Sequence, residues 1–170
     1  PIKTLAEALL LSSMAMQLNI TSRPASGMEH LVSHAWENLS IKRGEPVSLH
    51  GDKVGIGTLI ACDVFHEFFR EMRVPQKPLE GINYDCILEH WDELKAESDH
   101  LWEIKDRVAR QIHQAGGPVR PVQLGISPED VKYGLYHLTV GRPRVTIAHL
   151  IKALNLEDEI YNKVIPKWTD

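Results

Sequence analysis

Cysteine is scarce in this sequence, which holds two cysteines among 170 residues, Cys62 and Cys86, and no Cys-x-x-Cys pair. Two isolated cysteines fit a reducing compartment better than a disulfide-bonded scaffold. Residues 1–20 lack the basic leader and small-residue cleavage site of an export signal. We therefore expect a cytoplasmic protein.

An excess of positive charge and long apolar runs are lacking as well. The formal net charge is −4, and lysine and arginine form no cluster, which argues against a nucleic-acid partner. No apolar run approaches the ~20 residues that a membrane-spanning helix needs. We expect neither a nucleic-acid surface nor a membrane span.

Strand patterns are missing too, because no segment alternates apolar and polar residues over a convincing length. Apolar residues recur instead at helical spacing, and proline and glycine separate the segments. The fold class expected is an all-α helical bundle with antiparallel neighbours, forming one domain over residues 1–170. Helices are predicted at 3–19, 28–39, 50–73, 84–95, 97–115, from Ser127-Pro128 onward, at 146–154 and at 157–164, with loops at 40–47 and 75–83.

Two of these helices carry further expectations. The apolar residues of 3–19 suit a buried helix. The 50–73 helix is apolar on most sides and is predicted to be the central helix of the core. It contains Gly55 and Gly57, which are tolerated in a helix interior where another backbone comes close.

Three of the nine histidines fall near one another, at positions 30, 34 and 50. His30 and His34 are four residues apart and so share one helix face. His50 starts the glycine-bearing helix. Two histidines from two helices together with a carboxylate are a common ligand set for catalytic Zn²⁺ or Fe²⁺. The alternative is that each is an ordinary core or surface histidine.

Two longer motifs bear on that choice. Residues 21–37 (TSRPASGMEHLVSHAWE) and 49–58 (LHGDKVGIGT) resemble the metal-binding domain of the sn-glycerol-1-phosphate dehydrogenases. That family belongs to the superfamily of glycerol dehydrogenase, iron-containing alcohol dehydrogenase and 3-dehydroquinate synthase. Residues 124–138, and the run on to Thr146, look like the family's C-terminal region, so the resemblance covers most of the chain.

The resemblance implies one half of a two-domain enzyme. An N-terminal Rossmann-like domain would bind NAD(H) or NADP(H), and the helical C-terminal domain would bind a divalent metal, zinc foremost, with iron or nickel as alternatives. His30 and His50 match two of the family's metal ligands. The third ligand is an upstream aspartate, which nothing here matches, and no glycine-rich dinucleotide motif is present. We expect the nucleotide-binding domain as a partner, on the same or a separate polypeptide. From these residues alone we expect reduced metal affinity and no hydride transfer.

The remaining candidate residues concern the substrate, a small phosphorylated ketose or polyol such as dihydroxyacetone phosphate, which the family reduces to a glycerol phosphate. His34 is assigned a proton-relay or metal-supporting role, with a structural role equally open, and Glu29 or Asp52 is expected to orient a ligand imidazole. Ser22, Arg23 and Ser26 precede a helix N-terminus and are candidates for binding the phosphate; helix capping beside a surface arginine is the alternative.

Some residues depart from the family pattern. Asp52 stands where the family usually has glutamate, and Pro143 and Val145 stand where an acid and an aromatic residue are expected. These differences place the substrate in doubt more than the metal.

Two other functions fit the same residues. One is a 3-dehydroquinate synthase-like lyase, which would use the same ligands and NAD but release phosphate. The other is a stand-alone, non-catalytic helical binding subunit. Such a subunit would expose apolar surface and form homo-oligomers or aggregates.

Overall fold

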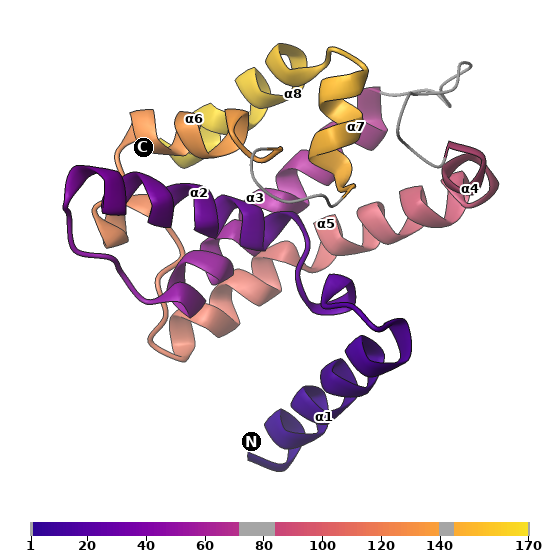
Figure 1. Ribbon diagram of the computed structural model, residues 1–170, viewed down its shortest axis with the longest axis horizontal. Helices are drawn as coiled ribbons and strands as arrows, with labels where there is room; N and C mark the ends of the chain where they lie inside the picture. The colour runs from indigo at the N-terminus through magenta and orange to yellow at the C-terminus, as the bar shows by residue number, and fades with distance from the viewer. Residues whose placement is uncertain (1, 72–83, 140–144, 170) are drawn as a thin grey trace.

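The computed structural model describes residues 2–71, 84–139 and 145–169, and within these ranges the chain is entirely helical, with no β-strand (Figure 1). This confirms the all-α fold class. The α-helices are α1 (Ile2–Asn19), α2 (Met28–Arg43), α3 (His50–Glu71), α4 (Tyr84–Glu89), α5 (Trp91–Gln114), α6 (Pro128–Tyr136), α7 (Ile147–Ala153) and α8 (Glu157–Val164). The described residues also form three 3₁₀ helices: η1 (Arg23–Ala25) between α1 and α2, η2 (Pro121–Leu124) between α5 and α6, and η3 (Ile165–Trp168) after α8.

Helix α3 is the centre of the molecule, as the sequence predicts. It contacts α2, α5 and α8 (Figure 1), so it is covered on several sides. Burial of the apolar side chains of this helix contributes to the main driving force for folding, the hydrophobic effect. Its fully buried apolar side chains are Ile56, Leu59, Ile60, Val64 and Phe68.

Two of the glycines of α3, Gly55 and Gly57, differ in what faces them. A Cβ atom at Gly57 would lie 2.6 Å from the Glu29 carbonyl oxygen on α2, whereas one at Gly55 would lie 3.8 Å from the Ile112 side chain, an ordinary contact. Gly57 therefore allows α2 and α3 to approach closely, as expected of a helix-interior glycine. This close approach decides where the histidines lie.

Helix α2 runs four residues beyond its predicted end and includes part of the expected loop 40–47. It ends at Gly44, whose backbone has a left-handed φ of 69°. The Glu45 N–H bonds the Ser40 carbonyl at 2.9 Å, which is the hydrogen bond of a Schellman motif. The stop signal is thus the glycine, and nothing before it interrupts the helix.

The two charge-rich helices, α4 and α5, are separated at His90, whereas the sequence predicted the break between them at residue 96. Trp91 is 6% exposed and packs on Phe69, with ring centroids 5.1 Å apart. Helix α5 begins at this buried anchor, a tertiary contact that local pattern does not reveal. By contrast, α6 begins where expected, with the Ser127 hydroxyl accepting the Asp130 N–H at 3.1 Å.

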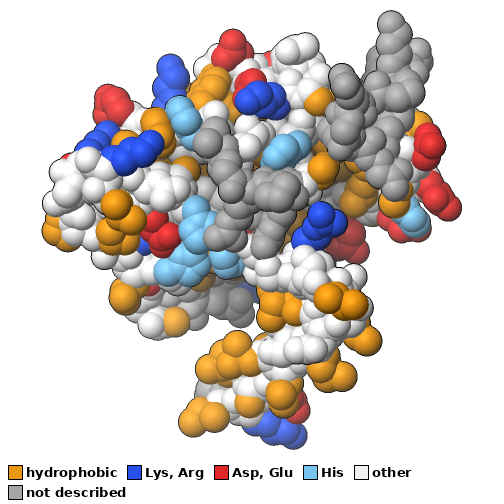
Figure 2. Space-filling model, viewed as in Figure 1, with side chains coloured by type: hydrophobic (Ala, Val, Ile, Leu, Met, Phe, Trp, Pro, Cys, Tyr) orange, Lys and Arg blue, Asp and Glu red, His pale blue; other side chains and the backbone are white. Residues whose placement is uncertain are grey.

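The prediction that the first helix is buried is wrong. Helix α1 has no buried residue, and it projects from the body with apolar side chains along its surface (Figures 1 and 2). Its main contact is the η1 turn. None of the described helices is both long enough and apolar enough to cross a lipid bilayer. The expected loop 75–83 lies outside the described residues.

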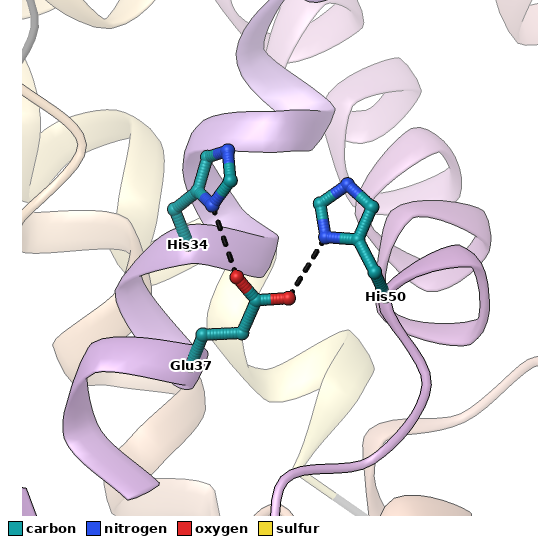
Figure 3. Close-up of side chains that lie close together, drawn as sticks. All are labelled: His34, Glu37 and His50. Atoms are coloured by element: carbon teal, nitrogen blue, oxygen red, sulfur yellow. Dashed lines mark hydrogen bonds and ion pairs between the residues drawn. The ribbon is translucent and has the colours of Figure 1, made fainter. Parts of the chain in front are cut away.

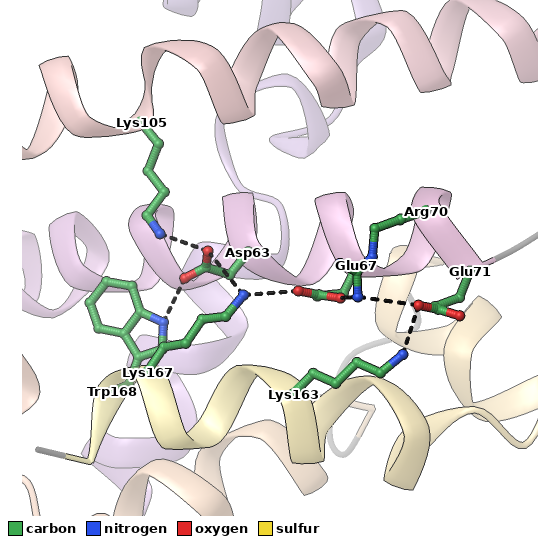
Figure 4. A network of polar contacts seen from close by, with 8 residues as sticks. All are labelled: Asp63, Glu67, Arg70, Glu71, Lys105, Lys163, Lys167 and Trp168. Carbon is green, nitrogen blue, oxygen red and sulfur yellow. Dashed lines mark hydrogen bonds and ion pairs between the residues drawn. The ribbon is translucent and has the colours of Figure 1, made fainter.

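Buried ion pairs fix the C-terminal segment and α5 onto α3 (Figure 4). The fully buried Asp63 accepts hydrogen bonds from Lys105 Nζ at 2.6 Å and Trp168 Nε1 at 2.8 Å. One turn on, Glu67 pairs with Lys167 at 2.9 Å. A buried carboxylate needs such donors because desolvation is otherwise unfavourable.

Candidate metal centre

The crossing of α2 and α3 brings three histidines together. His30 lies in the first turn of α2, His34 one turn later, and His50 is the first residue of α3. Ring centroids lie 5.3 Å apart for His30–His50 and for His34–His50, and 6.4 Å apart for His30–His34. Figure 2 shows several histidine side chains gathered on this face of the body.

All three imidazoles are accessible from solvent but not fully exposed. The exposed fractions of the side chains are 24% for His30, 29% for His34 and 46% for His50. The cluster therefore lies at the surface, where a substrate and a further protein segment can reach it.

Each imidazole has a carboxylate at its Nδ1 atom. Glu29 Oε1 lies 2.7 Å from His30 Nδ1. The two oxygens of Glu37 divide between the other rings, at 3.0 Å from His34 Nδ1 and 2.8 Å from His50 Nδ1 (Figure 3). The Nε2 atoms of His34 and His50 point away from Glu37 in this view.

The Glu37 carboxylate is itself surrounded by donors. Lys53, only 2% exposed, places Nζ 3.3 Å from Glu37 Oε1 and also bonds the Ser48 carbonyl. Burial raises the pKa of the Glu37 carboxyl. Hydrogen bonds from His50, His34 and Lys53 outweigh that effect and lower this pKa from 4.5 to about 2. Glu37 is therefore a carboxylate at neutral pH.

These residues fit a divalent metal. A histidine ligand usually donates its second ring nitrogen to a carboxylate, which leaves the first for the ion. An imidazole bound at ~2.1 Å places its centroid roughly 3.2 Å from the metal, so two such rings at the tetrahedral angle lie about 5.2 Å apart. The His30–His50 and His34–His50 spacings match this value. Separately, one ligand atom from each of His34, Glu37 and His50 lies within 4.8 Å of the others.

Sequence reasoning missed Glu37. Its position three residues after His34 was a usable signal, because residues at that spacing are neighbours on a helix. Its contact with His50 had no local signal, since it depends on how α3 packs on α2. Of the two carboxylates expected to orient an imidazole, Glu29 contacts His30, and Asp52 lines a separate depression with His113 and Gly117.

The candidate phosphate residues lie just ahead of α2. Arg23 is exposed and begins η1, and Ser22 and Ser26 flank that turn and are partly buried. The Gly27 N–H at the start of α2 donates to Glu29 Oε1 at 2.7 Å, so a carboxylate already accepts from this helix end. Phosphate binding by these three residues remains a prediction.

Three further histidines make contacts outside this cluster. His66 stacks on Trp102, with centroids 4.0 Å apart, and burial lowers its pKa. His137 stacks on Tyr133, and the His149 ring accepts the Thr146 N–H at 3.2 Å. None of these contacts involves His30, His34 or His50.

No protein-family model matches the chain, and no solved structure gives a match. Curated proteins do match. The glycerol-1-phosphate dehydrogenase [NAD(P)+] of Geobacillus thermodenitrificans is 34% identical over 133 residues, 75% of this chain and 32% of its own length. That of Geobacillus stearothermophilus is 33% identical over 144 residues, 79% of this chain and 34% of its own length. This chain is homologous to the C-terminal portion of the glycerol-1-phosphate dehydrogenases.

The similarity to these dehydrogenases extends to archaea. The Pyrococcus furiosus glycerol-1-phosphate dehydrogenase [NAD(P)+] is 30% identical over 151 residues, 89% of this chain and 29% of its own length. The chain spans about a third of the length of the curated relatives that it matches. The resemblance expected from residues 21–37 and 49–58 is thereby confirmed.

Proposed function

We propose that this chain is the metal- and substrate-binding part of a NAD(P)-dependent dehydrogenase of the glycerol-1-phosphate dehydrogenase type. His30 and His50 are the proposed metal ligands. The observation that supports this most is the convergence of three imidazoles, each with a carboxylate at Nδ1, in a chain homologous to these dehydrogenases. Zinc is the proposed metal, because imidazole ligands at a site with open positions suit it.

The nucleotide-binding residues are proposed to lie outside these 170 residues. The described residues contain no β-strand, whereas dinucleotide-binding domains are built on parallel sheets. The relatives are about three times as long as the segment they share with this chain, which leaves room for such a domain.

The chain's own residues have separable tasks in this proposal. A metal held by His30 and His50 would supply Lewis-acid chemistry at the substrate carbonyl, and NAD(P)H bound by the proposed nucleotide-binding domain would supply the hydride. His34 has its Nδ1 on Glu37, so its Nε2 is available to exchange a proton with the substrate oxygen. Ser22, Arg23 and Ser26 would bind the phosphate of a substrate such as dihydroxyacetone phosphate.

The test is a reductase assay on the full-length protein that carries this sequence. NAD(P)H oxidation should depend on dihydroxyacetone phosphate, and His30→Ala and His50→Ala should each abolish it. His100→Ala, at an exposed position on α5, should leave the rate unchanged. Equal rates in all four proteins would overturn the proposal, and release of inorganic phosphate from a phosphorylated substrate would assign a lyase instead.

A further inference from the structure

The Glu37 side chain lies between two histidines that belong to different helices. Its Oε2 atom is 3.0 Å from His34 Nδ1 on α2, and its Oε1 atom is 2.8 Å from His50 Nδ1 on α3 (Figure 3). One carboxylate thus contacts both rings, each through a separate oxygen. Neither histidine can change its ring orientation without losing one of these contacts.

The direction of the two hydrogen bonds follows from the donors around Glu37. Lys53 Nζ lies 3.3 Å from Oε1. The fully buried Ser33 hydroxyl donates to the same oxygen at 3.5 Å and therefore accepts from His50 Nδ1, which lies 3.2 Å away. A carboxylate accepts hydrogen bonds and donates none. Both Nδ1 atoms must therefore carry the proton, and in the neutral ring the lone pair is then on Nε2.

Glu37 is held in place from both helices. On α2 it follows His34 by three residues, so the two side chains share one face. On α3 the buried Lys53 reaches both Glu37 and the Ser48 carbonyl. Lys53 thereby ties the carboxylate to the segment that leads into His50.

We propose that Glu37 is the positioning residue of this site. By accepting Nδ1–H from His34 and His50, it sets both rings in the Nδ1–H tautomer and leaves both Nε2 atoms free to bind a metal or to exchange a proton. Glu29 has the same relation to His30, but it serves one ring. The role in metal binding rests on the proposed function, whereas the tautomer assignment does not.

The tautomers are measured in the metal-free chain by two-bond ¹H–¹⁵N correlation spectra of the histidine rings. The pH is held at about 8.5, roughly two units above the ordinary imidazole pKa. The signals of His34 and His50 are assigned with variants that each lack one histidine. Both rings should show the Nδ1–H pattern. The Nε2–H pattern in either ring of the unmodified chain would overturn the proposal without any variant being needed.

Substitutions at Glu37 sharpen this test. Glu37→Ala should release both rings from the Nδ1–H tautomer. Glu37→Gln has one accepting oxygen and one donating amide, so it should keep the tautomer in one ring and lose it in the other. The matched control is Glu93→Gln, because Glu93 lies three residues after His90, 3.1 Å from its Nδ1, on an exposed part of α5. Glu93→Gln should leave the tautomers of His34 and His50 unchanged.

Zinc affinity, measured by competition with a chromophoric chelator, gives the second readout. Loss of an outer carboxylate costs roughly 10–100-fold in metal affinity, and Glu37→Ala should fall in that range while Glu93→Gln stays at the unmodified value. If the unmodified chain binds no zinc but shows the Nδ1–H tautomers, the proposed function fails and the role of Glu37 stands. If it binds zinc and Glu37→Ala alters neither tautomers nor affinity, the role of Glu37 fails alone.

Discussion

At the scale of single residues, two kinds of carboxylate do different work. Asp63 is fully buried and paired with Lys105 and Trp168, whereas Glu37 holds two solvent-accessible histidines. The first is a structural contact and the second belongs to the candidate site. Substitutions at the two positions should separate stability from metal affinity.

The structural contact can be tested by its effect on unfolding. Asp63→Ala leaves Lys105 without its buried partner, and breaking a buried pair typically costs about 3–5 kcal/mol. We expect the free energy of unfolding, measured in urea, to fall by about that amount. The control is Asp99→Ala, which removes an ion pair with Lys95 whose side chains are about half exposed and should cost less than about 1 kcal/mol. Equal losses in the two variants would contradict the account.

A second pair makes stability depend on pH. Arg43 Nη2 and Nη1 lie 2.8 and 3.0 Å from the two carboxylate oxygens of Asp130, and this contact lowers the Asp130 pKa below its ordinary 3.8. A depressed carboxyl pKa stabilises the folded state above the unfolded pKa, and the gain is lost as pH falls through the folded pKa.

The corresponding measurement compares the chain with Arg43→Met by urea unfolding across acid pH. The unmodified chain should be the more stable by the largest margin near about pH 6, and the margin should shrink progressively below 3.8. A margin that stays constant into strong acid would mean that the arginine acts by packing instead of by charge.

At the scale of helices, the start of α6 at Ser127-Pro128 was predicted correctly, because serine and proline there are an explicit start signal. The end of α2 was predicted four residues too early, although Gly44, the residue that ends it, stands in the sequence. The break at His90 had no local signal, because it follows from burial of Trp91 against Phe69. In the same way, helical spacing predicted that His30 and His34 share a face. The contact between Glu37 on α2 and His50 on α3 could not be predicted in this way, because it depends on how the two helices pack and no local sequence pattern indicates that.

The close crossing of α2 and α3 gives an element-scale prediction. Gly57→Ala would place a Cβ atom 2.6 Å from backbone, so the helices must separate, and overpacking of this kind costs about 1–3 kcal/mol. Gly55→Ala meets only an ordinary contact at 3.8 Å and should stabilise by about 0.5–1 kcal/mol, because alanine favours helix interiors. Urea unfolding measures both. If Gly57→Ala lowers the free energy of unfolding and Gly55→Ala raises it, the close crossing is supported. A Gly57→Ala variant with unchanged stability contradicts it.

At the scale of the whole molecule, α1 is the feature that the sequence placed wrongly. Its periodicity predicts an amphipathic helix. Burial of the apolar face requires a surface to pack against, and the described residues provide little such surface for α1. Leu10 and Met14, four residues apart, are 65% and 60% exposed. Exposed apolar surface of this extent is typical of an interaction face.

We therefore expect the 170-residue chain to self-associate through α1. Light scattering coupled to size-exclusion chromatography should report species larger than the 19.3 kDa monomer at micromolar concentration. Leu10→Glu combined with Met14→Glu should restore the monomer, because charges on that face oppose burial. Val122→Glu, at an exposed position on η2, should not. A monomeric unmodified chain would contradict this prediction.

The central claim is that His30 and His50 hold a metal, and zinc titration of the chain by isothermal calorimetry tests it most directly. One zinc ion should bind per chain. His30→Ala and His50→Ala should each weaken binding by more than the roughly 10–100-fold that loss of an outer carboxylate costs, while His113→Ala, exposed at the end of α5, should leave it unchanged. Absence of zinc binding, or equal affinity in all four proteins, would contradict the account.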